Sequence, residues 1–327
     1  MLSQKETVVS RHDRVVIIGT GQVGATTAYA LLLSGVVSEV VLIDRDRRHA
    51  EGHVEDLRDA ALFARPTRVV AGEFGDCHDA DVVVITAGVH QDPTMRSRQD
   101  DLKQSAAILH EVVDQIAQAQ PTGVMLIASN PVDVLTGLAW QWSGLPPSRV
   151  IGSGTALDTA RLRWRLGQRY DVAPENVHAY VVGEHGDSQT AALSSARIAG
   201  IPIDEFCRDH DIEYDATVLA AIVDETRWAG LEIIRAKGAT YYGIGSALAR
   251  IVPAIVRDER AMFTVSTRVP PPMALGEMWL SVPAILGREG VVRVLSPSLN
   301  DDERKRLRDS AEIVRRVASD AILHQGA

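Results

Sequence analysis

The first half of the chain alternates short apolar runs, rich in valine and isoleucine, with longer segments of helical periodicity. The apolar runs are RVVIIG (14–19), EVVLID (39–44), RVVAG (68–72), DVVVITAG (81–88) and VMLIASN (124–130). The helical segments are predicted over 23–33, 49–63 and 98–118. β-Branched strands of this length that alternate with helices form a mostly parallel sheet, and the helices cover both of its faces. The pattern therefore predicts an α/β fold for this half.

The second half of the chain has a different pattern. A helical segment begins at 156, a strand is predicted near 177–183, and a long helical region follows over 215–256. The strand-like stretches 278–287 and 290–295 meet across a tight GREG turn, which is typical of an antiparallel pair. This half is therefore predicted to be α+β.

Length and charge limit what the chain can be. Its 327 residues exceed one ordinary core, so length alone predicts two domains or one large α/β domain. The change of pattern near 150–156 favours two domains, over 1–154 and 155–327. The formal net charge of −9 argues against a nucleic-acid partner, because a phosphate backbone needs a basic face. No apolar run approaches the roughly 20 residues of a membrane span, so no membrane partner is expected. The polar first residues also lack the apolar core of a signal peptide.

The two cysteines indicate the cellular compartment, but they do not indicate a metal or redox site. Cys77 and Cys207 stand alone in the sequence, without metal-binding or redox spacing. Lone cysteines suit a reducing environment. We therefore expect a cytoplasmic protein, and we expect no metal site.

A glycine motif closes the first predicted strand and opens the first predicted helix. It reads Gly19-x-Gly21-x-x-Gly24. Glycines in this context allow a tight turn and a close approach of the backbone to a pyrophosphate, while the helix N-terminus supplies free N–H groups and a positive dipole. The motif predicts a Rossmann dinucleotide-binding domain in the N-terminal half, and the C-terminal α+β half is then expected to carry the substrate.

Asp44 ends the second predicted strand, twenty residues after the last glycine of the motif. A carboxylate at this place accepts hydrogen bonds from the ribose hydroxyls and repels a 2′-phosphate, so NAD is favoured over NADP. Three neighbouring arginines leave NADP open as the alternative: Arg45, Arg47 and Arg48.

Two stretches of the second half carry side chains suited to acid–base chemistry. VVGEHGDS (181–188) presents His185 between glycines, and LDTAR (157–161) places Asp158 and Arg161 on one helix face. An aspartate can hold one ring nitrogen of a histidine and stabilise its charged form, and a guanidinium can grip a carboxylate through two parallel bonds. Taken alone, such residues are more often a polar turn and a surface ion pair.

Six motifs, in order along most of the chain, resemble those of the L-lactate/malate dehydrogenase family, and most closely those of its bacterial L-lactate dehydrogenase branch. They are GTGQVG (19–24), TAGVHQDP (86–93), SNPVD (129–133), GSGTALDTARLR (152–163), NVHAYVVGEHGDS (176–188) and KGATYYGI (237–244). The resemblance implies reversible hydride transfer between NADH and pyruvate, which gives L-lactate.

The resemblance also implies catalytic roles. His185 would donate and accept the proton, and Asp158 would orient it and raise its basicity. Arg161 would bind the substrate carboxylate, and Arg98 would polarise the carbonyl from a mobile loop. The other residues implied at the substrate are Gln91, Asn130, Asp133 and Thr240. The residues implied at NAD are Gly19, Gly21, Val23, Gly24, Asp44, Gly88, Val89, Ala128, Asn130 and Ser153.

The choice of 2-hydroxy acid is expected to depend on Gln91, where the malate branch has an arginine. A neutral glutamine cannot pair a second carboxylate, which favours pyruvate over oxaloacetate. The loop 92–97 is one residue longer than is usual in the family, so Arg96 could take the place of Arg98. We prefer Arg98, because the helix after it aligns without a gap. A dehydrogenase of 2-hydroxyisocaproate or of malate stays open as the alternative.

A nucleotide-binding module without chemistry is the alternative of another class. It would need the first half only, and it would leave His185, Asp158 and Arg161 without an explanation. Finally, Arg163 and His178 match the positions at which related enzymes bind fructose 1,6-bisphosphate at a subunit interface. The resemblance therefore implies this effector and a homotetramer.

Overall fold

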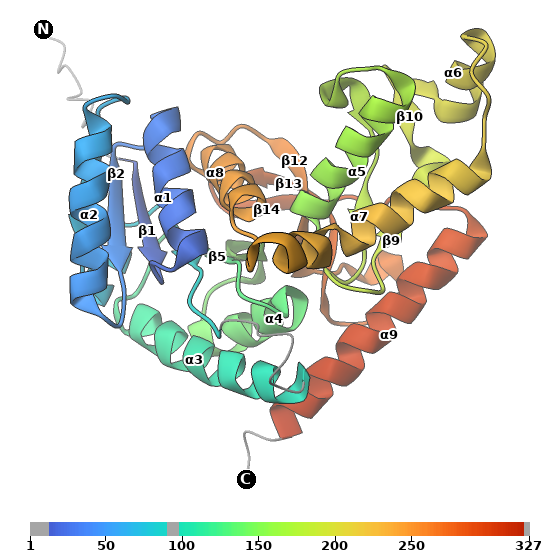
Figure 1. Ribbon diagram of the computed structural model, residues 1–327. Helices are drawn as coiled ribbons and strands as arrows, with labels where there is room; N and C mark the ends of the chain where they lie inside the picture. Colours follow the sequence, from blue (N-terminus) through green and yellow to red (C-terminus); the bar gives the residue numbers. More distant parts are fainter. Residues whose placement is uncertain (1–12, 90–97, 324–327) are drawn as a thin grey trace, which may run out of the picture.

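The computed structural model describes residues 13–89 and 98–323 of the chain (Figure 1). Its N-terminal half holds six parallel strands in the order β6-β5-β4-β1-β2-β3. Their bounds are β1 Arg14–Ile18, β2 Glu39–Ile43, β3 Arg68–Ala71, β4 Val82–Ile85, β5 Val124–Ile127 and β6 Val150–Gly152. This is the doubly wound sheet that the alternating runs predict.

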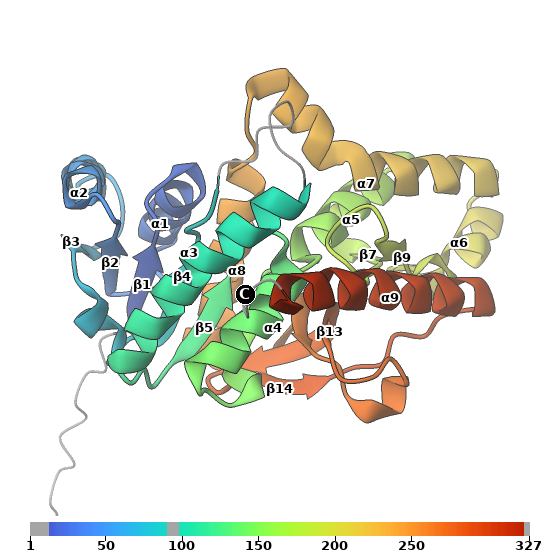
Figure 2. The ribbon, with the colours of Figure 1, turned by 90° about the horizontal axis from the view of Figure 1, so that it is seen from below.

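Helices cover both faces of this sheet (Figure 1, Figure 2). Successive side chains of a strand point to opposite faces, so Val15 and Ile17 of β1 pack on one side while Val16 and Ile18 pack on the other. The first side is covered by α1, α2 and α8, and the second by α3 and α4. The bounds are α1 Gln22–Ser34, α2 Arg47–Ala61, α3 Arg98–Gln118, α4 Val132–Ser143 and α8 Tyr242–Val256.

The sheet continues into the C-terminal half. Strands β12 (Ala261–Arg268), β13 (Trp279–Gly287) and β14 (Gly290–Val294) are antiparallel and extend it beyond β6, to nine strands among the described residues. A single pairing joins the two parts, between Gly152 of β6 and Ser266 of β12. The α+β character predicted for this half is therefore observed, but its large strands share a sheet with the N-terminal half.

The remaining elements pack around a third core, which includes Leu162, Leu166, Val181 and Ile198. Their helices are α5 Ala156–Tyr170, α6 Ile203–Asp209 and α7 Ala216–Lys237. Helix α9 (Asp301–Leu323) instead joins the core on the α3 and α4 side of the large sheet, through Leu307, Ala311 and Val314. The short strands around the third core are β7 Val177–His178, β8 Val181–Val182, β9 Thr190–Ala191, β10 Arg197–Ile198 and β11 Ile201–Pro202. Single 3₁₀ turns lie at 74–77, 147–149, 174–176, 193–195 and 271–273.

Two expected elements are divided in the structure. The strand predicted near 177–183 consists of β7, which pairs with β10, and β8, which pairs with β9. The helical region over 215–256 breaks at Gly238, whose φ of 84° ends α7 in the left-handed conformation. Asn300 and Glu303 begin α9 as a reciprocal cap, since each side chain accepts from the other's backbone N–H. No helix in the described part of the chain is long and apolar enough to cross a membrane.

Candidate active site

The loop between β1 and α1 depends on glycine at two positions. Gly19 has a φ of +95°, and a Cβ there would lie 2.7 Å from the backbone nitrogen of Ala87. A Cβ on Gly24, in the first turns of α1, would lie 1.9 Å from the carbonyl oxygen of Gly19. The helix and the strand end therefore approach each other as closely as the backbone allows, which brings the start of α1 to the edge of the sheet.

The N-terminus of α1 is open. Gly21 is the N-cap, no side chain caps the helix, and its first turn holds no acidic residue. A Cβ on Gly21 would meet nothing within 4 Å. The first N–H groups of a helix have no partner within the helix. These groups therefore face space at the positive end of the helix dipole, and the loop fits the pyrophosphate of a dinucleotide.

Asp44 follows β2 and is held by its own chain. Oδ2 accepts from the N–H of Thr20 at 2.7 Å and from its hydroxyl at 2.9 Å, and Oδ1 accepts from the N–H of Asp46 at 3.0 Å. Burial raises the pKa of the Asp44 carboxyl, but these hydrogen bonds and the nearby His49 outweigh it, and the net pKa is lowered. The carboxylate is thus fixed in its charged form at the place expected for the ribose contact.

The other residues predicted at the cofactor follow the carboxyl ends of neighbouring parallel strands. Gly88 and Val89 follow β4, Ala128 and Asn130 follow β5, and Ser153 follows β6. Asn130 is exposed and precedes a cis peptide bond to Pro131. Ser153 is buried. Carboxyl ends of parallel strands meet at one edge of a sheet, so these residues share the edge that also carries Gly19 and Asp44.

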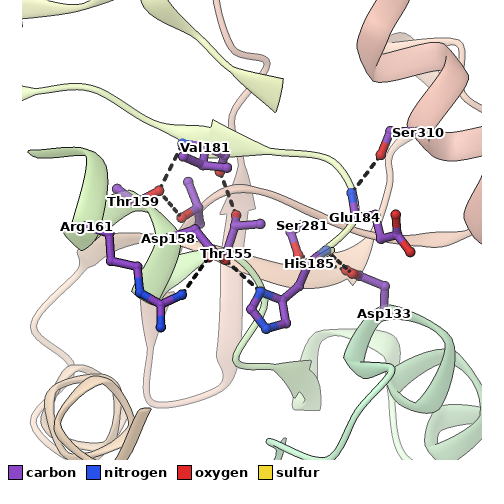
Figure 3. A network of polar contacts seen from close by, with 11 residues as sticks. Asp133, Thr155, Asp158, Thr159, Arg161, Val181, Glu184, His185, Ser281 and Ser310 are labelled. Atoms are coloured by element: carbon purple, nitrogen blue, oxygen red, sulfur yellow. Dashed lines mark hydrogen bonds and ion pairs between the residues drawn. The ribbon is translucent and has the colours of Figure 1, made fainter. Parts of the chain in front are cut away.

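His185 stands in a sharp turn after β8. Gly183 has a φ of +95°, and its backbone pairs with that of Ser281 in β13. The N–H of His185 then donates to Oδ2 of Asp133 at 2.8 Å, and the hydroxyl of Ser281 donates to Oδ1 of the same carboxylate at 2.8 Å (Figure 3). The glycine turns the chain off the strand, and the buried Asp133 fixes the backbone of the histidine.

Asp158 joins the histidine to the arginine (Figure 3). Its Oδ2 lies 2.6 Å from Nδ1 of His185, and its Oδ1 accepts from Nη1 of Arg161 at 3.2 Å. The Asp158 side chain is 3% exposed, whereas those of His185 and Arg161 are 26% and 14% exposed. The acid is therefore internal, and both of its partners reach a surface where a small molecule can meet them.

The charges of the cluster support one another. Burial lowers the pKa of His185, but the charge and hydrogen bond of Asp158 outweigh it, and the net pKa is raised. Burial raises the pKa of Asp158, but His185 and Arg161 outweigh it, and the net pKa is lowered. The pair therefore favours a protonated imidazole beside a charged carboxylate, which is the arrangement of a general acid.

Asp133 shows the opposite balance. Burial dominates and raises the pKa of its carboxyl, although His185 and Ser281 donate to it. Both of its oxygens are engaged inside the protein. In the structure Asp133 positions the His185 loop, and its predicted contact with substrate stays a prediction.

Sequence reasoning missed a further attachment of this loop. The N–H of Glu184 donates to the hydroxyl of Ser310 in α9 at 2.8 Å (Figure 3). The hydroxyls of Ser188 and Ser310 are 2.9 Å apart. Ser281 and Ser310 lie far along the chain from His185, and no local motif marks them. In the sequence, the glycine at 183 was the one hint of a close approach, and in the structure a Cβ there would lie 2.8 Å from Oγ of Ser310.

For four predicted substrate residues, the structure describes little or nothing of the side chain's contacts. Gln91 and Arg96 lie outside the described residues. Arg98 is the first residue of α3, and its side chain is not described. Thr240 is half-buried in the loop between α7 and α8. Their roles stay predictions.

The residues predicted at the effector lie on neighbouring elements. Nε of Arg163 in α5 donates to the carbonyl oxygen of Ala179 at 3.1 Å, and its guanidinium lies 5.1 Å from the centre of the Tyr180 ring. His178 in β7 is exposed, and it pairs with the exposed Arg197 of β10.

A dinucleotide-binding edge beside a histidine held by a buried aspartate defines a nicotinamide-dependent oxidoreductase. Comparisons with known proteins agree. The model of the lactate/malate dehydrogenase NAD binding domain matches residues 13–152, and that of the lactate/malate dehydrogenase alpha/beta C-terminal domain matches residues 155–322. The chain belongs to the lactate/malate dehydrogenase family, and it is an NAD-dependent enzyme.

Relatives of known name cover nearly the whole chain. It is 48% identical to an L-lactate dehydrogenase of Thermus aquaticus over 94% of this chain and 98% of that protein. It is 41% identical to an L-lactate dehydrogenase of Pediococcus acidilactici over 96% of each chain. The ligand-bound crystal structure of the minor L-lactate dehydrogenase from Enterococcus mundtii superposes with a TM-score of 0.90 at 39% identity, over 94% of this chain and 98% of that one. These likenesses confirm the resemblance stated from the motifs.

Proposed function

We propose that the chain is an L-lactate dehydrogenase, which interconverts pyruvate and L-lactate. The observation that carries this proposal is the single carboxylate of Asp158 that holds both His185 and Arg161. One acid thereby sets the distance between a proton donor and a cation that can bind a carboxylate. The names of the relatives support the same reaction.

Bound NAD supplies or accepts the hydride. His185 handles the proton, and its tautomer follows from its contact: Nδ1 carries a hydrogen directed at the Asp158 carboxylate, which can only accept. Nε2 is then the atom that faces substrate. In pyruvate reduction Nε2–H gives its proton to the carbonyl oxygen that becomes the hydroxyl, and in lactate oxidation the neutral Nε2 takes that proton back.

Arg161 anchors the substrate carboxylate. Its Nη1 donates to Asp158, and its guanidinium has further N–H groups to offer. A Cβ on Gly230 of α7 would lie 3.7 Å from Nη1, so α7 packs close beside the guanidinium. This confinement favours a small 2-oxo acid held through two parallel hydrogen bonds.

Gln91 is proposed to select the substrate, because a neutral side chain leaves a second carboxylate unpaired. The test is NADH oxidation with pyruvate, oxaloacetate and 2-oxoisocaproate, on the native chain and on Gln91→Arg. The highest kcat/KM is expected for pyruvate, and the variant should move preference toward oxaloacetate. A highest kcat/KM for 2-oxoisocaproate or oxaloacetate in the native chain would replace the proposal with the corresponding 2-hydroxyacid dehydrogenase. No turnover on any of the three, with NADH still bound, would leave a nucleotide-binding module.

We further propose a homotetramer activated by fructose 1,6-bisphosphate, which would bind near Arg163 and His178. The support is a group of basic side chains at one place: Arg163 contacts the strand end next to His178, and Arg197 lies opposite His178 in the adjacent strand. Two phosphate groups would pair such side chains. Sedimentation and pyruvate saturation curves with and without the bisphosphate, on the native chain and on Arg163→Gln, test this. An unchanged half-saturation concentration in the native chain would remove the effector and leave the reaction in place.

We propose a cytoplasmic location. Cys77 and Cys207 are both free and buried, which suits a reducing compartment. Fractionation of cells that produce the native chain tests this, and recovery with secreted proteins would contradict it.

A further inference from the structure

A chain of hydrogen bonds leads from the predicted ribose contact to a histidine on the surface. The hydroxyl of Thr20 donates to Oδ2 of Asp44 at 2.9 Å. Oγ1 of the same threonine lies 2.9 Å from Nδ1 of His49. Thr20 is fully buried, and His49 lies in the first turn of α2 and is exposed. The carboxylate predicted to contact the cofactor ribose is thus linked to a histidine side chain.

The direction of these hydrogen bonds can be assigned. A hydroxyl has one hydrogen, and the Thr20 hydrogen goes to the carboxylate, because a charged acceptor forms the stronger bond. Thr20 then accepts from Nδ1–H of His49. Nε2 of His49 is therefore the free nitrogen: it carries a lone pair in the neutral ring and a hydrogen in the protonated ring.

We propose that His49 is a second determinant of the choice between NAD and NADP, acting together with Asp44, and that its protonation weakens the selection of NAD. With a neutral ring, His49 does not offset the charge of Asp44, which repels a 2′-phosphate. A protonated ring places a positive charge 3.8 Å from Oδ2 of Asp44, measured from Nδ1. The protonated His49 ring offsets the repulsion between Asp44 and the 2′-phosphate, and its Nε2–H can donate to an anion.

The surroundings of the ring limit which groups take part. Asp44 at the end of β2 and His53 on α2, whose ring centre is 4.7 Å away, are the titratable groups that contact it. Asp46 is the N-cap of α2, and Thr20 is uncharged.

Arg47, a cation that the sequence offered for NADP, is engaged elsewhere. Its guanidinium bonds to Glu51 and to Glu73, each at 3.0 Å. It lines a cavity of about 420 Å³ beside Asp44, where Glu73 adds a further negative charge. Arg47 is thus paired with acids of its own, whereas His49 contacts Thr20 and lies beside Asp44.

The test measures binding and needs no turnover. Dissociation constants of NADH and NADPH are determined from nucleotide fluorescence between pH 8 and pH 6, on the native chain and on His49→Asn. Asparagine keeps an N–H donor near the position of Nδ1 and cannot titrate. The 2′-phosphate itself gains a proton in this range, with a pKa near that of other phosphate monoesters, about 6, so the variant measures that background.

As the pH is lowered from 8 to 6, the ratio of the NADPH to the NADH dissociation constant should decrease in both proteins. The decrease should be about two- to fivefold larger in the native chain than in His49→Asn, which corresponds to one exposed ionic contact. His49→Lys, which carries a fixed charge, should lower the ratio already at pH 8. Equal pH dependence in the native chain and in His49→Asn would overturn the proposal, and so would an unchanged ratio in His49→Lys. Should His49→Asn lose NADH binding altogether, the lysine variant decides alone.

Discussion

The nucleotide edge and the acid–base cluster are built by different means. At the nucleotide edge, a backbone turn, a helix end and a carboxylate meet within one β-α-β unit, and the contact between Thr20 and Asp44 spans 24 residues. In the cluster, side chains from separate elements meet: Ser281 and Asp133 are 148 residues apart, and Glu184 and Ser310 are 126 apart. The first region depends on backbone shape and the second on buried charge. Substitutions should therefore impair binding in one and chemistry in the other.

The largest separation of the two effects is expected for His185→Asn. This change removes the proton donor, and general acid–base catalysis contributes roughly 10²–10⁴-fold. Turnover of NADH with pyruvate should fall by about that factor, while the NADH dissociation constant stays within about twofold. Steady-state kinetics and a fluorescence titration of NADH measure both. A variant that also loses NADH would show that the two regions are not independent.

Asp158→Asn is expected to have the next largest effect, through pH. Asp158 raises the pKa of His185 against the opposing effect of burial, so the uncharged amide should let that pKa fall. Pyruvate reduction needs the protonated ring, and its rate should then decline at lower pH than in the native chain. Each unit of pKa lost removes about tenfold of the protonated form on the alkaline side.

The measurement for Asp158→Asn is the pH profile of kcat for pyruvate reduction, and lactate oxidation should gain at low pH in the same variant. A lower rate with an unshifted profile would mean that Asp158 acts on geometry alone.

Two glycines of the nucleotide edge form a matched pair. A methyl group on Gly24 would meet the carbonyl of Gly19, whereas one on Gly21 would enter space that the protein leaves open. Gly24→Ala should lower the free energy of unfolding by about 1–3 kcal/mol. Gly21→Ala should keep stability and weaken NADH binding by about tenfold or more, since the methyl group takes the place of the pyrophosphate. Urea unfolding and NADH titration separate the two, and equal behaviour in both assays would contradict the assignment.

The smallest effect is expected for Ser310→Ala, which acts on the cluster from α9. The N–H of Glu184 loses its acceptor, and a buried donor left without a partner costs about 1–3 kcal/mol. Some of this cost should appear as a severalfold loss of kcat with KM for NADH unchanged, because the His185 loop loses one attachment. Ser319→Ala, at an exposed position of the same helix, is the control. Loss of stability in both variants alike would point to the helix and exclude a specific effect on the loop.

The difference between the nucleotide edge and the acid–base cluster also explains which parts of the structure the sequence could predict. The strands at 14–19, 39–44 and 124–130 and the helix over 98–118 follow from periodicity, which acts between near neighbours. The break at Gly238 within 215–256 was missed, since a glycine after an apolar run can stand inside a helix or end it. The nucleotide edge could be predicted from spacing, because its parts are close in the chain.

The acid–base cluster was harder to derive from spacing. Asp158 and Arg161 are spaced as any surface ion pair would be, and only the resemblance joined them to His185. Ser281 and Ser310 carry no pattern, because a serine contributes through where the fold places it. Their roles required the three-dimensional arrangement.

The joint between Gly152 and Ser266 bears on how such chains can be recombined. The two family models meet between 152 and 155, yet the sheet passes through this point. A gene cut there would yield two fragments, in which β6 and β12 each keep one partner strand and expose the other edge. Exposed strand edges promote aggregation. Chimaeras of two relatives would need both parents to fit at Gly152, where a Cβ would lie 2.8 Å from that of Ser266. The contact between β6 and β12 thus limits which N-terminal and C-terminal halves can be combined in one chain.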